Sequence, residues 1–214
     1  MKAGYKTLLD LAARYLDTRK NDIHVNEAIR LVPQILKEVH ADEDVVMPAL
    51  ILHDLGWKMV PEDVQLKAFG PREIDEGLRR VHEVEGARLA GQILAEVGYD
   101  EKKADEIVRI IDGHDSRTTA FSLNDMVVKD CDKLTRFCKA GFSIDCERFG
   151  IPPDEYADWL DQQIDKWFFT ETAKRLASKE VQQRKSESES KFKVARTSHE
   201  ERGSYGKIRR HNHR

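Results

Sequence analysis

Apolar residues recur at every third or fourth position along most of this chain, and this spacing predicts amphipathic helices. In segment 22–40, for example, Val25, Ala28 and Val32 fall on one stripe. Segment 43–56 differs because its middle is almost continuously apolar, which is typical of a helix buried on all sides. No stretch shows the regular alternation of apolar and polar residues that predicts a β-strand. The pattern therefore predicts an all-α fold.

About seven helices follow from these patterns. We expect them over residues 1–20, 22–40, 43–56, 80–97, 102–113, about 124–139 and about 153–180. Asn124 or Asp125 has a side chain suited to capping the start of the sixth helix. Residues 57–78 break the pattern, because they hold two prolines and two glycines among many charges. Such long connections often form lids or binding loops.

Length and composition fit one domain followed by a polar segment. The chain has 214 residues, of which 40% are hydrophobic, enough for a packed core. Its net charge of −3 is uneven, because residues 184–214 carry ten Lys and Arg against four Asp and Glu. We expect residues 1–182 to form a single all-α domain and residues 183–214 to be a tail without fixed structure. The acidic body argues against nucleic acid as a partner of the domain.

The cysteines and the hydropathy indicate a cytoplasmic protein. Cys131, Cys138 and Cys146 are odd in number and show no CxxC spacing, so a disulfide framework is not expected. No apolar run approaches the ~18 residues that span a bilayer. Asp10 and Asp17 interrupt the apolar pattern at the start of the chain, which fits an amphipathic helix rather than a signal peptide. The oligomeric state stays open.

Four histidines occupy the same kind of position, each at the end of an apolar stripe on a different predicted helix. They are His24, His53, His82 and His114. A single inward histidine is most often a hydrogen-bonded core residue, but four are harder to explain in that way. Asp54 and Asp132 also lie among apolar residues, where a buried carboxylate needs a strong partner. Imidazole nitrogens and carboxylate oxygens together are the ligands of ions such as Zn, Mn and Fe.

The order of these residues resembles a known signature. His24, the pair His53-Asp54 and the later Asp132 are similar to the H…HD…D signature of the HD-domain metal-dependent phosphohydrolases. The context is similar as well, since ALILHDLG resembles the family's apolar run into its HD pair and VVKDCDKL resembles its later helix. The resemblance covers about residues 20–140 and implies an HD-type helical bundle with a metal site in its core.

Two further histidines lie between the HD pair and the last Asp, and they affect the number of metal ions. HD proteins with two such histidines tend to hold two ions, whereas those with only the four core ligands generally hold one. The resemblance thus implies a dinuclear site in which Asp54 bridges the ions. Its six ligands would be His24, His53, Asp54, His82, His114 and Asp132. The alternative is a mononuclear site, with His82 and His114 as polar residues of the pocket.

Asp115, Asp130 and Trp57 lie near the expected ligands but are not counted among them. Asp115 forms a second His-Asp dipeptide with His114, but this dipeptide follows Gly113 beyond the end of a predicted helix. Asp130 stands two residues before Asp132 and therefore faces another side of the same helix, which favours capping, ion pairing or support of a ligand. Trp57 could stack on a base, but we expect it in the core.

This ligand set suits phosphoester hydrolysis. Two metal ions ~3.5–4 Å apart can clamp the attacking and leaving oxygens of a phosphoryl group and make hydroxide available near neutral pH. We therefore expect a metal-dependent phosphohydrolase that cleaves a phosphate ester or anhydride of a small molecule, with a nucleotide as the expected substrate. His53 and Asp54 are the expected catalytic residues. The cofactor would be one or two divalent ions of Mn, Fe, Co, Ni, Mg or Zn.

Phosphate groups need cations beyond the metal ions. Lys58, four residues after Asp54, and Arg117, three after His114, are the best candidates for substrate binding. Each would more often be a solvated surface charge. A wider set, near the ligands or in the 57–78 connection, consists of Arg72, Arg79, Arg80 and Arg136.

Two other functions are compatible with the same ligands. A minority of six-ligand HD proteins resemble inositol oxygenase and use two irons to cleave C–C or C–P bonds with O₂. That group tends to keep a lysine one helical turn beyond the last histidine, where this chain has Thr118, and this weakly favours hydrolysis. The third function is a non-catalytic nucleotide-binding sensor with a degenerate metal site, against which the complete ligand set argues.

Overall fold

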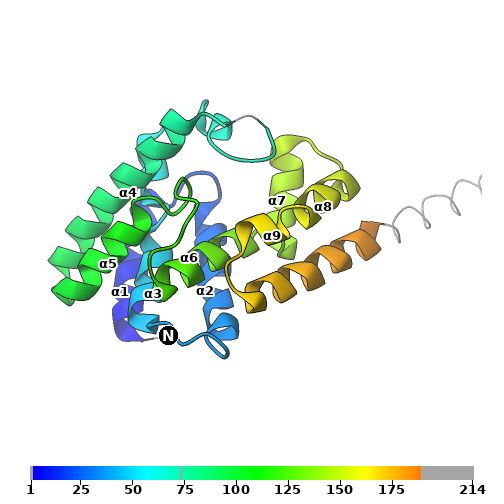
Figure 1. Cartoon of the computed structure of the whole chain (residues 1–214). Helices are drawn as coiled ribbons and strands as arrows, with labels where there is room; N and C mark the ends of the chain where they lie inside the picture. The colour runs from blue at the N-terminus through cyan, green and yellow to red at the C-terminus, as the bar shows by residue number, and fades with distance from the viewer. Residues whose placement is uncertain (1, 73, 189–214) are drawn as a thin grey trace, which may run out of the picture.

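The computed structural model describes residues 2–72 and 74–188, and this part of the chain consists of helices and their connections, without a strand (Figure 1). The α-helices are α1 (Ala3–Ala12), α2 (Asn21–Ile35), α3 (Glu43–Leu52), α4 (Glu76–Glu96), α5 (Glu101–Ile111), α6 (Leu123–Leu134), α7 (Lys139–Phe149), α8 (Pro153–Asp161), α9 (Ile164–Trp167) and a last helix over residues 171–188. The short 3₁₀ helices are η1 (Ala13–Tyr15), η2 (Leu55–Met59) and η3 (Gln65–Lys67). The all-α prediction is confirmed, with more helices than expected. None of the described helices is both long enough and apolar enough to cross a membrane.

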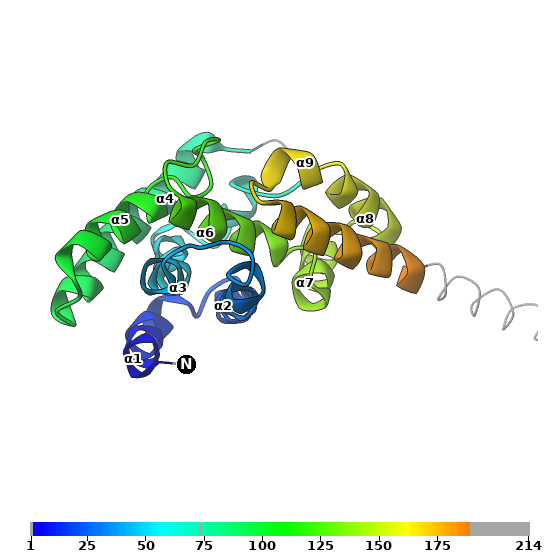
Figure 2. The same cartoon turned by 60° about the horizontal axis from the view of Figure 1, so that its bottom comes forward.

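Helix α3 is the centre of the bundle. Every residue from Val45 to Leu52 is buried, and α1, α2, α5 and α6 all pack against this helix (Figure 2). The Asp42 side chain caps its start by accepting a hydrogen bond from the Asp44 amide at 2.8 Å. Because burial of apolar surface stabilises this helix on every side, its C-terminal end at His53 is held in a fixed place inside the molecule. The ends of buried helices are therefore where this fold can position polar side chains.

The connection that follows α3 lies tightly against α4. Gly56 in η2 approaches the α4 backbone so closely that a β-carbon would overlap the carbonyl oxygen of His82 and lie 2.6 Å from the Gly86 nitrogen. Trp57 and Phe69, both buried, anchor the rest of this connection in the core. The connection over residues 57–78, expected as a lid or binding loop, is therefore attached to the core through these two side chains.

Helix α7 was not expected from the sequence, because one of its buried positions is polar. The predicted helix 124–139 ends at Leu134, and α7 begins at Lys139. Its buried residues include Asp145, which is paired with two arginines, so the apolar stripe is too weak to reveal the helix. The cap of α6 also differs from expectation, since Ser122, not Asn124 or Asp125, accepts a hydrogen bond from the helix start.

The helix predicted over residues 153–180 is in fact three helices, and a buried carboxylate explains the break. Asp130 of α6 accepts hydrogen bonds from the Phe169 amide at 2.8 Å and from the Thr170 amide at 2.9 Å. These bonds hold the chain in a non-helical turn and cap the helix over residues 171–188, which fits the capping role expected of Asp130. That helix continues six residues into the segment 183–214, which we expected to lack fixed structure. Residues 189–214 lie outside the described residues.

We predict that Gly56→Ala destabilises the fold, because a methyl group cannot fit between η2 and α4 without moving one of them. Overpacking of this kind costs about 1–3 kcal/mol in the free energy of unfolding. Urea denaturation followed by circular dichroism measures the effect. Gly4→Ala is the matched control, since nothing lies within 4 Å of a β-carbon at Gly4. Equal stability of the Gly56→Ala variant and the wild type would contradict the close approach of η2 to α4.

Candidate metal centre

The six side chains predicted as ligands come from five segments and converge in the core. His24 lies in α2, His53 and Asp54 follow the end of α3, His82 lies in α4, His114 follows α5 and Asp132 lies in α6. Their ligand atoms form overlapping groups, within each of which all atoms lie within 4.8 Å of one another. Except for His24, these residues are buried. The sequence thus identified residues that the fold brings together.

One group, here called site A, consists of His24, His53 and Asp132. The Nε2 atoms of the two histidines are 3.1 Å apart, and the Oδ1 atom of Asp132 lies 3.1 Å from Nε2 of His24 and 3.8 Å from Nε2 of His53. Asp54 adds carboxylate oxygens 3.6 Å from each of these nitrogens. Two nitrogens and carboxylate oxygens from two residues therefore surround one small volume.

A second group, site B, consists of His82, His114 and Asp115. The Nε2 atoms of its histidines are 3.4 Å apart, and the Oδ2 atom of Asp115 lies 3.4 Å from His82 and 3.9 Å from His114. Oδ1 of Asp54 lies 3.7 Å from Nε2 of His114. Asp54 thus faces both sites, which is the position that a bridging ligand requires.

Backbone carbonyls orient two of the histidines. The Nδ1–H group of His53 donates to the Leu50 carbonyl at 2.8 Å, and that of His114 donates to the Ile111 carbonyl at 2.9 Å. A carbonyl oxygen can only accept, so the proton is fixed on Nδ1. Nε2 is then left with a lone pair directed into the cluster, as in metal-binding histidines whose other nitrogen is held by a hydrogen bond.

Thr135 orients His24 in the same way. The Thr135 hydroxyl donates to the Asp132 carbonyl at 2.6 Å, so it accepts from Nδ1–H of His24 at 3.1 Å. The lone pairs of His24 and His53 therefore face each other across 3.1 Å. Two such lone pairs repel unless a cation lies between them, either a proton or a metal ion. The donor set and its orientation fit a divalent ion.

The electrostatics of the cluster favour charged ligands. Burial opposes ionisation of Asp54, Asp115 and Asp132, but the nearby His and Lys side chains outweigh it and hold the pKa of each carboxyl well below its usual range. Burial also opposes the charged form of His53, yet the Asp54 and Asp132 carboxylates raise its pKa to about 9. The carboxylates therefore favour a positive charge at this place, which a proton or a metal ion can supply.

Asp115 and Lys133 belong to this cluster, although neither was predicted as a site residue. Lys133 forms an ion pair with Asp115 and another with Oδ2 of Asp132 at 3.0 Å, so it joins site B to site A. The signal for Asp115 was the second His-Asp dipeptide, which was set aside because it lies beyond a helix. The chain folds back at Gly113, with a φ of 120°, and this turn buries His114 and brings Asp115 to the wall of the first cavity.

Trp57 contacts two of the predicted ligands, Asp54 and His82. It is buried, as expected, and its indole Nε1–H donates to Oδ1 of Asp54 at 3.0 Å. Its ring stacks on His82 with the centroids 4.0 Å apart. Trp57 is therefore a core residue that also positions two predicted ligands, and its ring is not free to stack on a substrate.

Of the two cations expected to bind substrate, the structure brings one near the cluster. Lys58 donates to Asp17 at 2.7 Å and lines neither of the two cavities described below, so the structure does not place it near the cluster. Arg117 forms an ion pair with Asp125 at 3.1 Å and lines a cavity that His114 also lines. Helix α3 ends at Leu52, and the chain then changes direction. Lys58 is therefore not placed one turn of α3 beyond Asp54, as its spacing suggested.

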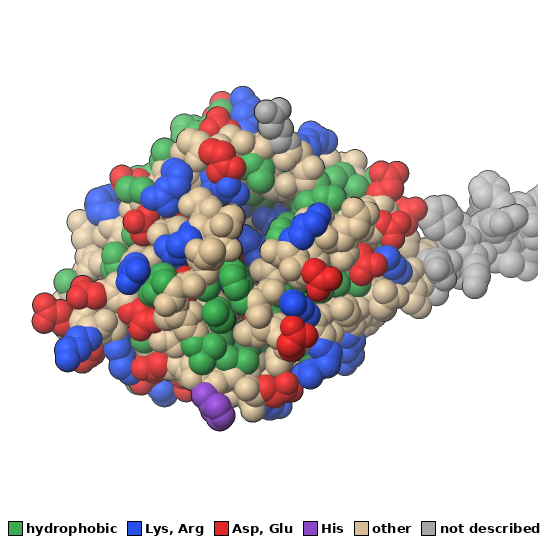
Figure 3. Space-filling model, in the orientation of Figure 1, with side chains coloured by type: hydrophobic (Ala, Val, Ile, Leu, Met, Phe, Trp, Pro, Cys, Tyr) green, Lys and Arg blue, Asp and Glu red, His purple; other side chains and the backbone are tan. Residues whose placement is uncertain are grey.

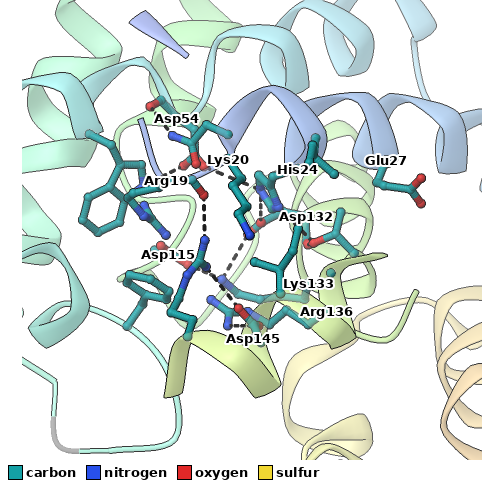
Figure 4. Close-up of a pocket in the computed structure, with 18 residues that line it drawn as sticks. Arg19, Lys20, His24, Glu27, Asp54, Asp115, Asp132, Lys133, Arg136 and Asp145 are labelled. Carbon is teal, nitrogen blue, oxygen red and sulfur yellow. Dashed lines mark hydrogen bonds and ion pairs between the residues drawn. The ribbon is translucent and has the colours of Figure 1, made fainter. Parts of the chain in front are cut away.

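Two cavities reach the cluster. The first is lined by Asp54, Asp115 and Asp132, whose side chains point into it together with Lys133 and Arg136 (Figure 4). Its remaining cations are Arg19, Lys20 and Arg148. The second shares Asp115, Lys133 and Arg136 with the first and is also lined by Trp159, Trp167 and Phe169. One face of the molecule shows a hollow with Lys and Arg side chains in it (Figure 3).

The comparison with protein families agrees with this geometry. The HD domain family matches residues 21–136, which is more than half of the chain and contains all six predicted ligands. Comparisons with curated proteins and with solved structures found no match. HD domains are in general metal-dependent hydrolases. The chain therefore belongs to the HD-domain superfamily of metal-dependent phosphohydrolases.

Proposed function

We propose that this protein hydrolyses a phosphate ester or anhydride of a nucleotide with the help of two divalent metal ions. The observation that carries the proposal is the position of Asp54 between site A and site B. Asp54 lies at the wall of a cavity that several Lys and Arg side chains also line. When bound, the two ions would polarise the phosphoryl group and lower the pKa of water. The residues of sites A and B would hold them, with Asp115 as a further ligand of site B.

Lys133 would neutralise charge on the phosphoryl group. Burial alone would lower its pKa, but Asp115 and Asp132 outweigh burial and raise it, so the ammonium group keeps its charge. It lines both cavities and already joins the two sites. A fixed positive charge at this place can stabilise the negative charge that develops on the oxygens during phosphoryl transfer. Lys133 would thus act as an electrostatic group and not as a base.

The aromatic side of the second cavity supports a nucleotide as the substrate. Trp159, Trp167 and Phe169 are partly exposed there, beside the cations that line both cavities. Aromatic rings and a planar base attract each other by offset stacking. A nucleotide with its phosphate at sites A and B could place its base against these rings.

We predict that Asp54→Asn loses most of the bound metal and lowers phosphate release by at least ~10²-fold, because the bridging charge is removed. The measurement combines the metal content of gently purified protein with a phosphatase panel in Mn, Mg, Co, Ni and Fe. Asp105→Asn is the control, since Asp105 is an exposed aspartate of α5 outside the cluster. It should keep both properties.

Other outcomes of the same measurement would replace the proposal. Two irons per chain with O₂ consumption and no phosphate release would identify an oxygenase of the inositol oxygenase type. Protein that binds none of the five metal ions would instead support the non-catalytic nucleotide-binding sensor.

We further predict that His82→Gln lowers the metal content from about two ions per chain to about one, because site B loses a ligand while site A keeps its own. Elemental analysis of the purified variant gives the stoichiometry. His40→Gln, which changes an exposed histidine, should still bind two ions. A single ion in both the wild type and His82→Gln would instead support the mononuclear site.

A further inference from the structure

Three arginines surround the ring of Phe69 at the wall of the first cavity. The distances from their guanidinium carbons to the ring centroid are 4.0 Å for Arg19, 5.4 Å for Arg136 and 5.3 Å for Arg148. These three residues, here called the arginine cluster, line the cavity that Asp54 and the other carboxylates of sites A and B also line. Arg19 comes from the segment before α2 and the other two from α7 and the turn before it, so only the fold assembles the cluster.

The arginine cluster carries more positive charge than its surroundings neutralise. Asp145 is its one ion-pair partner among the described residues, with Arg136 at 2.9 Å and Arg148 at 3.1 Å. The same carboxylate also accepts a hydrogen bond from the Tyr156 hydroxyl at 2.7 Å. One negative charge at ion-pair distance from the cluster thus faces three positive charges, while the carboxylates of sites A and B lie further off in the same cavity. Lys133 does not change this balance, because its own partners are two carboxylates.

Arg19 is the member of the cluster that lacks partners. Its Nε and Nη1 atoms are shielded from solvent and have no hydrogen-bond acceptor among the described residues, and it forms no ion pair with them. Its guanidinium lies 3.7 Å from the Trp57 ring centroid. Burial lowers its pKa to about 9, although Asp54 opposes this. Holding an unpaired cation in such a place is costly unless an anion completes the site.

The backbone at Arg19 is strained as well. Arg19 and Lys20 have φ angles of 57° and 59°, in the left-handed region that non-glycine residues seldom adopt. Arg148 holds this conformation, because its Nη2 atom donates to the Arg19 carbonyl at 2.6 Å. Strain of about 1–3 kcal/mol persists only where the surroundings enforce it, and it is concentrated at binding sites. One arginine of the cluster therefore fixes the position of another.

We infer that the arginine cluster is a subsite for a second phosphoryl group, so that the substrates carry two or more phosphates joined in a chain. The inference rests on the proposed function, because the first phosphoryl group would lie at sites A and B beside Lys133. Guanidinium groups bind phosphate oxygens through two parallel hydrogen bonds, and their stacking on aromatic rings leaves the N–H edges free. A single phosphoryl group held at the metal sites would leave the cluster's excess charge uncompensated.

Two anions that carry one phosphoryl-type group and two linked ones test this inference. Isothermal titration calorimetry of the full chain compares methylenediphosphonate with inorganic phosphate, in metal-loaded protein and in protein dialysed after chelator treatment. We expect the wild type to bind methylenediphosphonate at least ~10-fold more tightly in both states, because the second group meets the arginines. In metal-loaded protein, Arg19→Gln should reduce this preference to less than ~3-fold while the affinity for inorganic phosphate and the metal content stay unchanged.

Two further variants complete the test. Arg175→Gln is the control, since this exposed arginine pairs with Glu38 and lines neither cavity. Arg19→Lys keeps the charge but loses the two-pronged hydrogen bonding, and it should weaken the preference by an intermediate factor. This variant provides the test if Arg19→Gln does not give a wild-type circular dichroism spectrum.

Contrary outcomes separate this inference from the proposed function. Equal affinity of the wild type for both probes, or equal weakening of both in Arg19→Gln, would overturn the arginine subsite even if the protein hydrolyses phosphomonoesters. Absence of metal and of hydrolysis would overturn the proposed function. In that case the preference of the chelator-treated protein for methylenediphosphonate still decides whether the arginine cluster binds linked phosphates.

Discussion

A carboxylate placed at the end of the most buried helix is the constraint around which this molecule is organised. Helix α3 is apolar on every side, and its chain direction delivers Asp54 into the core, where an unpaired negative charge would be very costly. His24 of α2 and His114 after α5 meet it there, and His82 of α4 lies beside His114. Each histidine has an acid within 4 Å, so the cluster ties together the five segments that supply its ligands.

The packing around this cluster is correspondingly tight. Gly56 lets the chain turn away from Asp54 while it lies against α4, and Trp57 then closes over His82 and donates to Asp54. Backbone carbonyls hold the outer nitrogens of His53 and His114. The ligand orientations are thus fixed by groups outside the ligand set, which is how a preorganised metal site keeps its geometry.

Outside the metal sites the balance of charge reverses. Sites A and B gather carboxylates and histidine lone pairs that attract cations. The neighbouring arginine cluster gathers three guanidinium groups around Phe69, of which those of Arg136 and Arg148 share Asp145 as a partner. The cavity lining therefore changes from carboxylates and an imidazole at one end to guanidinium groups at the other. A bound metal–phosphate complex has the same arrangement of charge, with the cation at one end and phosphate oxygens at the other.

The sequence by itself determined the helical class, the central buried helix and the six candidate ligands, because periodicity and buried polar residues are local properties of the chain. It could not reveal α7, because the buried side of that helix contains Asp145. The burial of this carboxylate depends on ion pairs with Arg136 and Arg148, which the apolar pattern does not show. It also could not place Lys58 or Asp115, because one depends on where α3 ends and the other on a turn at Gly113. Arg19 gave no signal at all. Its position beside Trp57, Phe69 and Arg148 is a property of tertiary structure, since the partners that hold it come from three separate segments of the chain.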